Sequence, residues 1–251
     1  MAQIKPLAHA PVVEAVVDLR VNAPDGMSNE RLNTALDGLD FGYHKKGPIL
    51  RGSFGFAINP QETPAARQLL GETTIIGFRL HSTDEKYVAQ FTTEGFSLSR
   101  LEPYQSWGAL ITEAQRVWVI YQKCVTPTRI HRTATRFINN LRLPLRQGER
   151  FERFLTGLPV MPPEYPQAIT SFLQRFVVYD EQCGATAILT QALEQFTVDQ
   201  PLPVILDIDV YRETKFSADG PDVWKYLSDL RALKNRLFFG ALTDEAVELY
   251  A

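Results

Sequence analysis

The sequence predicts an α+β fold in which one unit occurs twice: a strand, a short helix, several antiparallel strands and a long helix. The first observation is that residues 1–126 and 127–251 show the same order of elements. The second is that residues 16–21 align with residues 138–143, both inside the opening strand of their half. Such a chain favours one curved antiparallel sheet with the two long helices on one face.

The first half opens on a strand at residues 12–21, where apolar residues alternate with Glu14, Asp18 and Arg20. Alternation with a period of two gives a strand one polar face. Ser28 is placed to cap a short helix that ends near Leu36. Further strands are expected at residues 54–58, 73–81, 87–93 and 96–100, and Ser106 precedes a long helix. The apolar stripe of that helix contains Trp107, Leu110, Ile111, Ala114, Val117, Trp118 and Tyr121.

The second half repeats this order. A long strand is expected at residues 129–143, a short helix at 149–155, and a proline-rich connector at 158–165. Strands at residues 172–179, 186–193 and 204–211 precede a helix that starts at Pro221. The stripe of that helix contains Val223, Tyr226, Leu227, Leu230, Leu233 and Leu237, and Thr243 is placed to cap a terminal turn.

Composition limits the classes of protein. The hydrophobic share of 45% and the charged share of 22% over 251 residues are those of a globular chain that can bury a core without disulfides. The net charge of −3 argues against a chain dedicated to nucleic acid or to anionic membrane. Cys124 and Cys183 form no CxxC pair, so a reducing cytoplasm is expected. The N-terminal residues lack the apolar core of a signal peptide, and we expect no membrane segment.

A strand, a helix, antiparallel strands and a closing helix, present twice, resemble the saddle architecture of the TATA-binding-protein fold. That resemblance implies that the two opening strands lie side by side at a pseudo-dyad. It carries no function, because folds host unrelated functions. The strand faces that would correspond to the DNA-binding saddle carry Glu14, Asp18, Asp207 and Asp209, which would repel phosphate.

Five segments are spread over nearly the whole chain: LAHAPVVEAVVDLRV, EGFSLSRLEPYQSW, RTATRFINNLRLP, ILDIDV and LRALKNRLFFGALTDEAVELY. In sequence, order and spacing they resemble a sporadically distributed, functionally uncharacterised prokaryotic family of about this length. The resemblance implies a bacterial cytoplasmic protein, and it supplies no catalytic residues.

Motifs with a known chemistry are missing from the sequence. It contains no Walker loop, no HExxH, no GxSxG and no GxGxxG, and its four histidines have no partner at ligand spacing. We therefore expect no cofactor. The best acidic pair is Asp207 and Asp209, which lie on one strand face about 6–7 Å apart. These two could hold a divalent cation or act as acid and base, but hard cations usually gather more oxygen ligands. The favoured interpretation is that both are solvated or paired with arginines.

The best basic cluster lies between Arg116 and Arg153. Within it, Arg132, Arg136, Asn140 and Arg142 share one strand face, where guanidinium groups could bind phosphate in a bidentate manner. The alternative, which we favour, is that Arg132 and Arg136 pair with Glu14 and Asp18 of the neighbouring opening strand.

Three functions remain open at this point. The favoured hypothesis is a non-enzymatic binding or assembly protein whose sheet contacts a protein partner or a second copy. The alternative is an enzyme or sensor for a phosphorylated or nucleotide ligand, using the arginine face. Direct binding of nucleic acid is the least favoured, because the total charge is acidic and basic residues are not interleaved with aromatic ones.

Overall fold

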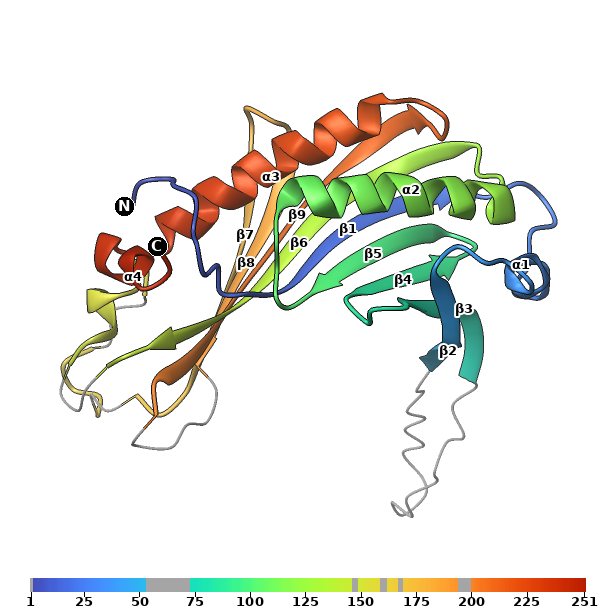
Figure 1. Cartoon of the computed structure of the whole chain (residues 1–251). Helices are drawn as coiled ribbons and strands as arrows, with labels where there is room; N and C mark the ends of the chain where they lie inside the picture. The colour runs from blue at the N-terminus through green and yellow to red at the C-terminus, as the bar shows by residue number, and fades with distance from the viewer. Residues whose placement is uncertain (1, 53–72, 146–148, 159–161, 167–168, 194–199) are drawn as a thin grey trace, which may run out of the picture.

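The computed structural model describes residues 2–52, 73–145, 149–158, 162–166, 169–193 and 200–251 (Figure 1). Across these residues, nine strands form one antiparallel sheet in the order β2-β3-β4-β5-β1-β6-β9-β8-β7. The α+β class and the single large antiparallel sheet expected from the sequence are confirmed. None of the helices in the described residues is both long and apolar enough to cross a membrane.

The elements of the first half are β1 (Val12–Asn22), α1 (Asn29–Leu36), β2 (Tyr43–Gly52), β3 (Thr73–Ser82), β4 (Tyr87–Thr92), β5 (Gly95–Leu101) and α2 (Trp107–Val125). Those of the second half are β6 (Arg129–Leu143), a short 3-10 helix η1 (Phe151–Arg153), β7 (Phe172–Asp180), β8 (Ala185–Leu193), β9 (Leu202–Ser217), α3 (Asp222–Gly240) and α4 (Asp244–Glu248).

The opening strands β1 and β6 lie side by side and antiparallel at the centre of the sheet, as the sequence predicts. On its other side, β1 pairs with β5, the strand that precedes α2. In the same way β6 pairs with β9, the strand that precedes α3. Each half thus continues outward from the centre in reverse chain order.

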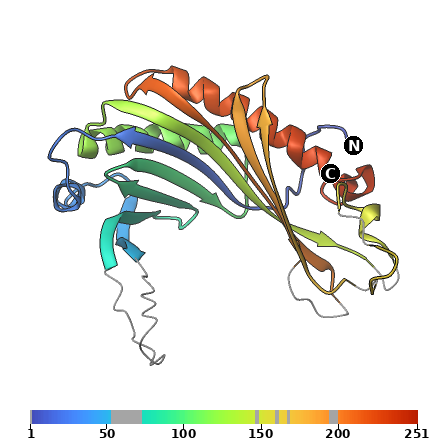
Figure 2. The ribbon, with the colours of Figure 1, turned by 180° about the vertical axis from the view of Figure 1, so that it is seen from behind.

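The two long helices pack against the middle of the sheet. Helix α2 contacts β1 and β5, and helix α3 contacts β6, β8 and β9. The ring of Phe137 on β6 lies 6.3 Å from the ring of Trp107 at the start of α2, and 3.8 Å from Nζ of Lys234 on α3. Phe137 thus contacts a residue of each helix, and we call the face of the sheet on which it lies the covered face. Figures 1 and 2 show how the ribbons of α2 and α3 run along the sheet.

The core lies between the covered face and the helices. Ala15, Val17 and Leu19 alternate along β1 and are fully buried, and opposite them on β6 lie Phe137, Thr135 and Thr133. From α2, the buried side chains are Leu110, Ala114, Val117, Trp118, Tyr121 and Val125, which follow the stripe expected from the sequence. The aromatic rings of Phe91, Phe96, Trp118 and Tyr121 pack together at its centre.

Three helix caps are confirmed. The hydroxyls of Ser28, Ser106 and Thr243 accept hydrogen bonds from the first-turn backbone of α1, α2 and α4. These bonds satisfy N–H groups that have no partner inside the helix. Pro221 is the N-cap of α3 and lies one position before the expected place.

Other boundaries differ from the expectation. The expected strand at residues 54–58 lies outside the described residues, whereas β2 was not expected because Gly47 and Pro48 interrupt its sequence pattern. The structure accommodates them at an edge strand with two register shifts. The helix expected at 149–155 is only η1, because the chain already forms a bridge to Leu242 at Leu155. Strand β9 extends to Ser217, since β6 remains beside it after β8 ends.

Candidate functional site

The charged residues that the sequence singles out lie on the side of the central strands opposite the covered face. Residues between the buried positions point to this side, which we call the open face. In β1 these are Glu14, Val16, Asp18 and Arg20. One row across the sheet runs Ser99, Val16, Arg136, Asp209, Ile188 and Val177, each opposite the next on neighbouring strands. The row places the candidate residues Arg136 and Asp209 on one surface.

Arg132 joins carboxylates from two strands. Its Nη1 donates to Oδ1 of Asp18 on β1 at 3.1 Å, and its Nη2 lies 3.9 Å from Oδ2 of Asp209 on β9. Arg20 also contacts Asp18, at 3.0 Å. The guanidinium of Arg132 lies 4.4 Å from the centre of the Tyr211 ring, so an aromatic face supports it as well.

Arg136 forms a bidentate pair with Asp207. Its Nε and Nη2 donate to the two carboxylate oxygens at 2.9 and 2.6 Å. The hydrogen bonding of Arg136 to the carboxylate of Asp207 raises the pKa of Arg136. Burial raises the pKa of Asp209 and outweighs the opposing effect of Arg132 and Arg136. We call the whole set the ion-pair network: Asp18, Arg20, Arg132, Arg136, Asp207 and Asp209.

The predicted pairing between opening strands is therefore confirmed for Arg132 and Asp18 but wrong for the partner of Arg136. The register explains the difference. Arg136 lies opposite Val16 on β1, while Glu14 lies opposite Ile138. On its other side Arg136 lies opposite Asp209, and Asp207 is the diagonal neighbour, which long side chains reach.

The four residues proposed for phosphate share the open face but do not surround one point. Arg132 and Arg142 are ten residues apart on one strand, which corresponds to roughly 33 Å in an extended chain. Arg132 and Arg136 belong to the ion-pair network, whereas Asn140 and Arg142 lie toward the other end of β6. One phosphate group cannot contact all four, and the two central arginines already have carboxylate partners.

Asp207 and Asp209 lie on the open face, as expected. Asp207 accepts two hydrogen bonds from Arg136, which occupy both of its oxygens. In the described part of the chain, no three His, Cys, Asp or Glu residues are grouped so that they could hold a metal ion. Asp207 and Asp209 thus each lie beside an arginine, as the favoured interpretation expects. That the two carboxylates hold a divalent cation stays a prediction.

The sequence did not indicate that Lys234 and Arg100 are buried. Lys234 is 7% exposed on the covered face, where its amine faces the rings of Phe137 and Phe238. Burial, with a smaller effect of Arg231, lowers the pKa of Lys234 to about 7. Arg100 is 2% exposed and stacks on Tyr87, while its Nη2 donates to the carbonyl of Pro103. No sequence signal separates such residues from surface lysines and arginines at the same helical or strand spacing.

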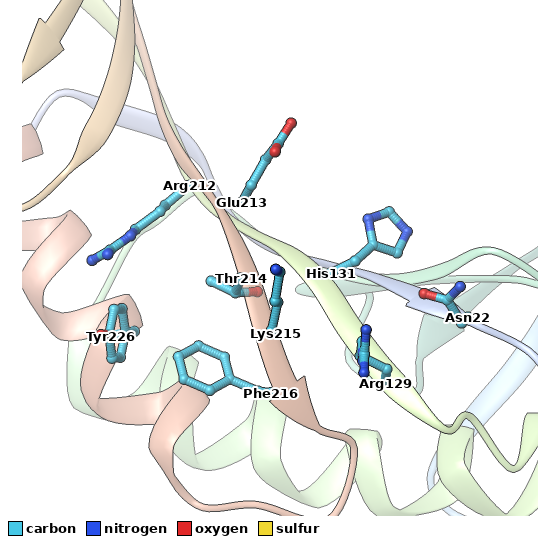
Figure 3. Close-up of a pocket in the computed structure, with 9 residues that line it drawn as sticks. All are labelled: Asn22, Arg129, His131, Arg212, Glu213, Thr214, Lys215, Phe216 and Tyr226. Carbon is cyan, nitrogen blue, oxygen red and sulfur yellow. The ribbon is translucent and has the colours of Figure 1, made fainter.

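A hollow of about 840 Å³ lies beside the ends of β6 and β9 (Figure 3). Its lining residues are Asn22, Arg129, His131, Arg212, Glu213, Thr214, Lys215, Phe216 and Tyr226. Arg212 donates to the carbonyl of Cys183 at 2.9 Å and extends toward the ring of Tyr226. The side chains of Arg129, His131 and Lys215 have no ion pair or hydrogen bond with any other described residue.

No protein-family model and no curated protein sequence matches this chain. Its family therefore remains a prediction that rests on the five segments quoted above.

Proposed function

We propose that this is a non-enzymatic binding protein that presents the open face of its sheet to a protein partner. The observation that supports the proposal best is the neutralised charge at the centre of that face. The two arginines at its centre are bound to carboxylates of the same face, so they are not available to a phosphate. A surface whose central charges are already paired favours a partner that recognises shape and apolar area.

Apolar residues surround the ion-pair network. Val16, Ile138, Ile188 and Ile205 lie on the open face and keep part of their surface exposed, and Val177 lies further out on β7. Partly exposed aliphatic side chains around a charged centre give the mixed composition of a non-obligate protein interface. With both long helices on the covered face, as we propose below, neither helix covers these residues.

A photo-reactive amino acid at Ile188 tests the proposal in cells of the natural host. We expect ultraviolet light to link this position to a discrete second protein, identified by mass spectrometry. The matched control carries the same amino acid at Val119, an exposed residue of α2. Equal products from the two positions, or none from Ile188, would contradict an open-face partner.

We also propose that residues 1–126 and 127–251 are a tandem duplication, with both long helices on equivalent places of one face. The mirrored strand order about β1 and β6 supports this. A superposition that aligns β1, β5 and α2 with β6, β9 and α3 in chain order tests it. A best alignment that requires another order of elements would reject it.

A phosphorylated or nucleotide ligand is the second candidate, and its site is the hollow beside β6 and β9. The observation in its favour is that Arg129, His131 and Lys215 line the hollow without a partner of their own in the described residues. Glu213 is the one carboxylate among its lining residues. A hollow with excess positive charge attracts anions even in a chain of negative net charge.

Calorimetric titration with inorganic phosphate and with ATP distinguishes the hollow from the arginines of the open face. We expect the Arg129→Gln variant to bind these anions at least several-fold more weakly than the parent. Arg142→Gln removes an exposed arginine from the other end of the same strand and should change nothing. Equal losses in the two variants, or no binding by the parent, would reject the hollow as an anion site.

A further inference from the structure

We propose that β7 pairs with β7 of a second copy of the chain, antiparallel, so that two sheets join edge to edge. This surface is the backbone edge of β7, whereas the protein partner proposed above contacts the open face, with which β7 shares side chains such as Val177. Either proposal can therefore fail without the other.

Strand β7 is an edge that is ready to pair. It is the last strand of the sheet and forms an unbroken register with β8 from Phe172 to Asp180. It contains no proline, glycine or lysine. Its exposed large apolar side chains, with their exposed fractions, are Leu173 (74%), Phe176 (46%), Val177 (61%), Val178 (42%) and Tyr179 (66%). A long apolar edge without a bulge is a template for another strand.

The opposite edge has the devices that prevent such pairing. Strand β2 contains Gly47, at a register shift, and Pro48, which lacks a backbone N–H. A second shift follows between Ile49 and Leu50. Bulges, proline and charged side chains are the means by which natural sheets protect their edges. The contrast between the two edges indicates that β7 is kept free for a partner.

The pattern of β7 is complementary to itself. Antiparallel pairing of identical edge strands generates a two-fold axis perpendicular to the sheet, and opposite residues then share a face. With the axis at Val177, that residue meets its own copy, and Phe176 lies opposite Val178 of the second copy. Arg175, which has no ion pair among the described residues, then lies opposite Tyr179 of the second copy.

The register centred on Val177 is more favourable for pairing than registers centred on nearby residues of β7. Moving the axis to Arg175 would place like charges directly opposite each other, which destabilises a strand pair. Moving it to Phe176 would place Arg175 opposite an aliphatic residue, Val177. Only the register centred on Val177 gives each apolar residue from Phe176 to Val178 an apolar partner and each Arg175 an aromatic ring.

A two-fold axis perpendicular to the sheet leaves the open faces of the two copies on the same side. Val177 and Ile188 lie on that side, so the join would extend one surface across both copies.

Sedimentation velocity of the full chain over a range of concentrations is the first test. We expect a dimer for the parent and a monomer for Val177→Lys, because two lysines would face each other on the axis. Val119→Lys, on an exposed position of α2, is the matched control and should remain dimeric. Matching far-ultraviolet circular dichroism spectra of both variants exclude misfolding. A monomeric parent, or a dimeric Val177→Lys variant, overturns the proposal.

Cysteine cross-linking tests the register. Cys124 and Cys183 are first changed to serine, and single cysteines are then placed at Val177 or Leu173. Under mild oxidation, we expect a disulfide-linked dimer from position 177 and at least ten-fold less from position 173. Equal cross-linking at both positions, or none at 177, overturns pairing about Val177.

Discussion

At the scale of single residues, Lys234 places a cost on folding that depends on pH. Burial lowers its pKa from 10.5 to about 7, so the folded chain binds this proton less tightly than the unfolded chain does. The stability of the parent should therefore rise between about pH 7 and pH 10.5, and the full penalty applies below pH 7. Lys234→Met should raise the free energy of unfolding by about 3–5 kcal/mol at pH 6, and much less at pH 10. Urea unfolding at the two pH values measures this, and equal gains would show that the amine is not buried as a neutral group.

Arg136 allows a second test at the residue scale. Its side chain is 48% exposed, so solvent screens the pair with Asp207, whose side chain is only 18% exposed. Arg136→Ala should lower the free energy of unfolding by about 1 kcal/mol, mainly because the carboxylate loses its hydrogen-bond donors. Melting temperatures with and without phosphate and nucleotides check this. A variant as stable as the parent that loses a ligand-induced shift would show that Arg136 is a ligand residue.

At the scale of elements, helix α2 packs on the sheet partly through aromatic residues. Trp118 is 4% exposed, and its ring lies 5.6 Å from that of Phe96 and 5.2 Å from that of Tyr121. Trp118→Ala should cost about 3–5 kcal/mol of stability, because the fixed sheet below cannot close the cavity. Chemical denaturation measures this cost. Val119→Ala, on the exposed side of the same helix, is the control and should change stability by less than about 0.5 kcal/mol.

Some elements were predictable because they depend only on residues close together in the sequence. Caps at Ser28, Ser106 and Thr243 and the stripe of α2 were predictable, because each depends on a few neighbouring residues. Strand β2 was not, since Gly47 and Pro48 are tolerated only at an edge, and edge position is a property of the whole sheet.

The candidate site was predictable only in part. The strand face of Arg132 and Arg136 follows from alternation, which is local. Alternation does not predict the ion-pair partner of Arg136, because that partner depends on the register between strands far apart in the sequence. The hollow beside β6 and β9 combines residues from β1, β6, β9 and α3, so no spacing along the chain indicates it.

At the scale of the whole molecule, the two halves are joined through one sheet, and this predicts how fragments behave. The seam is the ladder between β1 and β6, and Phe137 of the second half packs against Tyr104 and Trp107 of the first. A fragment of residues 127–251 would turn β6 into an uncovered edge and expose Phe137. We expect this fragment to be unfolded or aggregated in isolation, as judged by circular dichroism and sedimentation.

Mixing that fragment with residues 1–126 completes this test. The cut between the two pieces falls after Thr126, in the link between α2 and β6, so it interrupts neither element. We expect the two pieces to form a one-to-one complex, since together they restore the β1–β6 ladder and the contacts of Phe137. Phe137→Ala in the second piece should weaken the complex at least ten-fold, whereas Arg142→Gln, an exposed position on the same strand, should not. Two fragments that each fold alone as stable monomers, and do not associate, would show instead that the halves are independent domains and that the seam contributes little to either core.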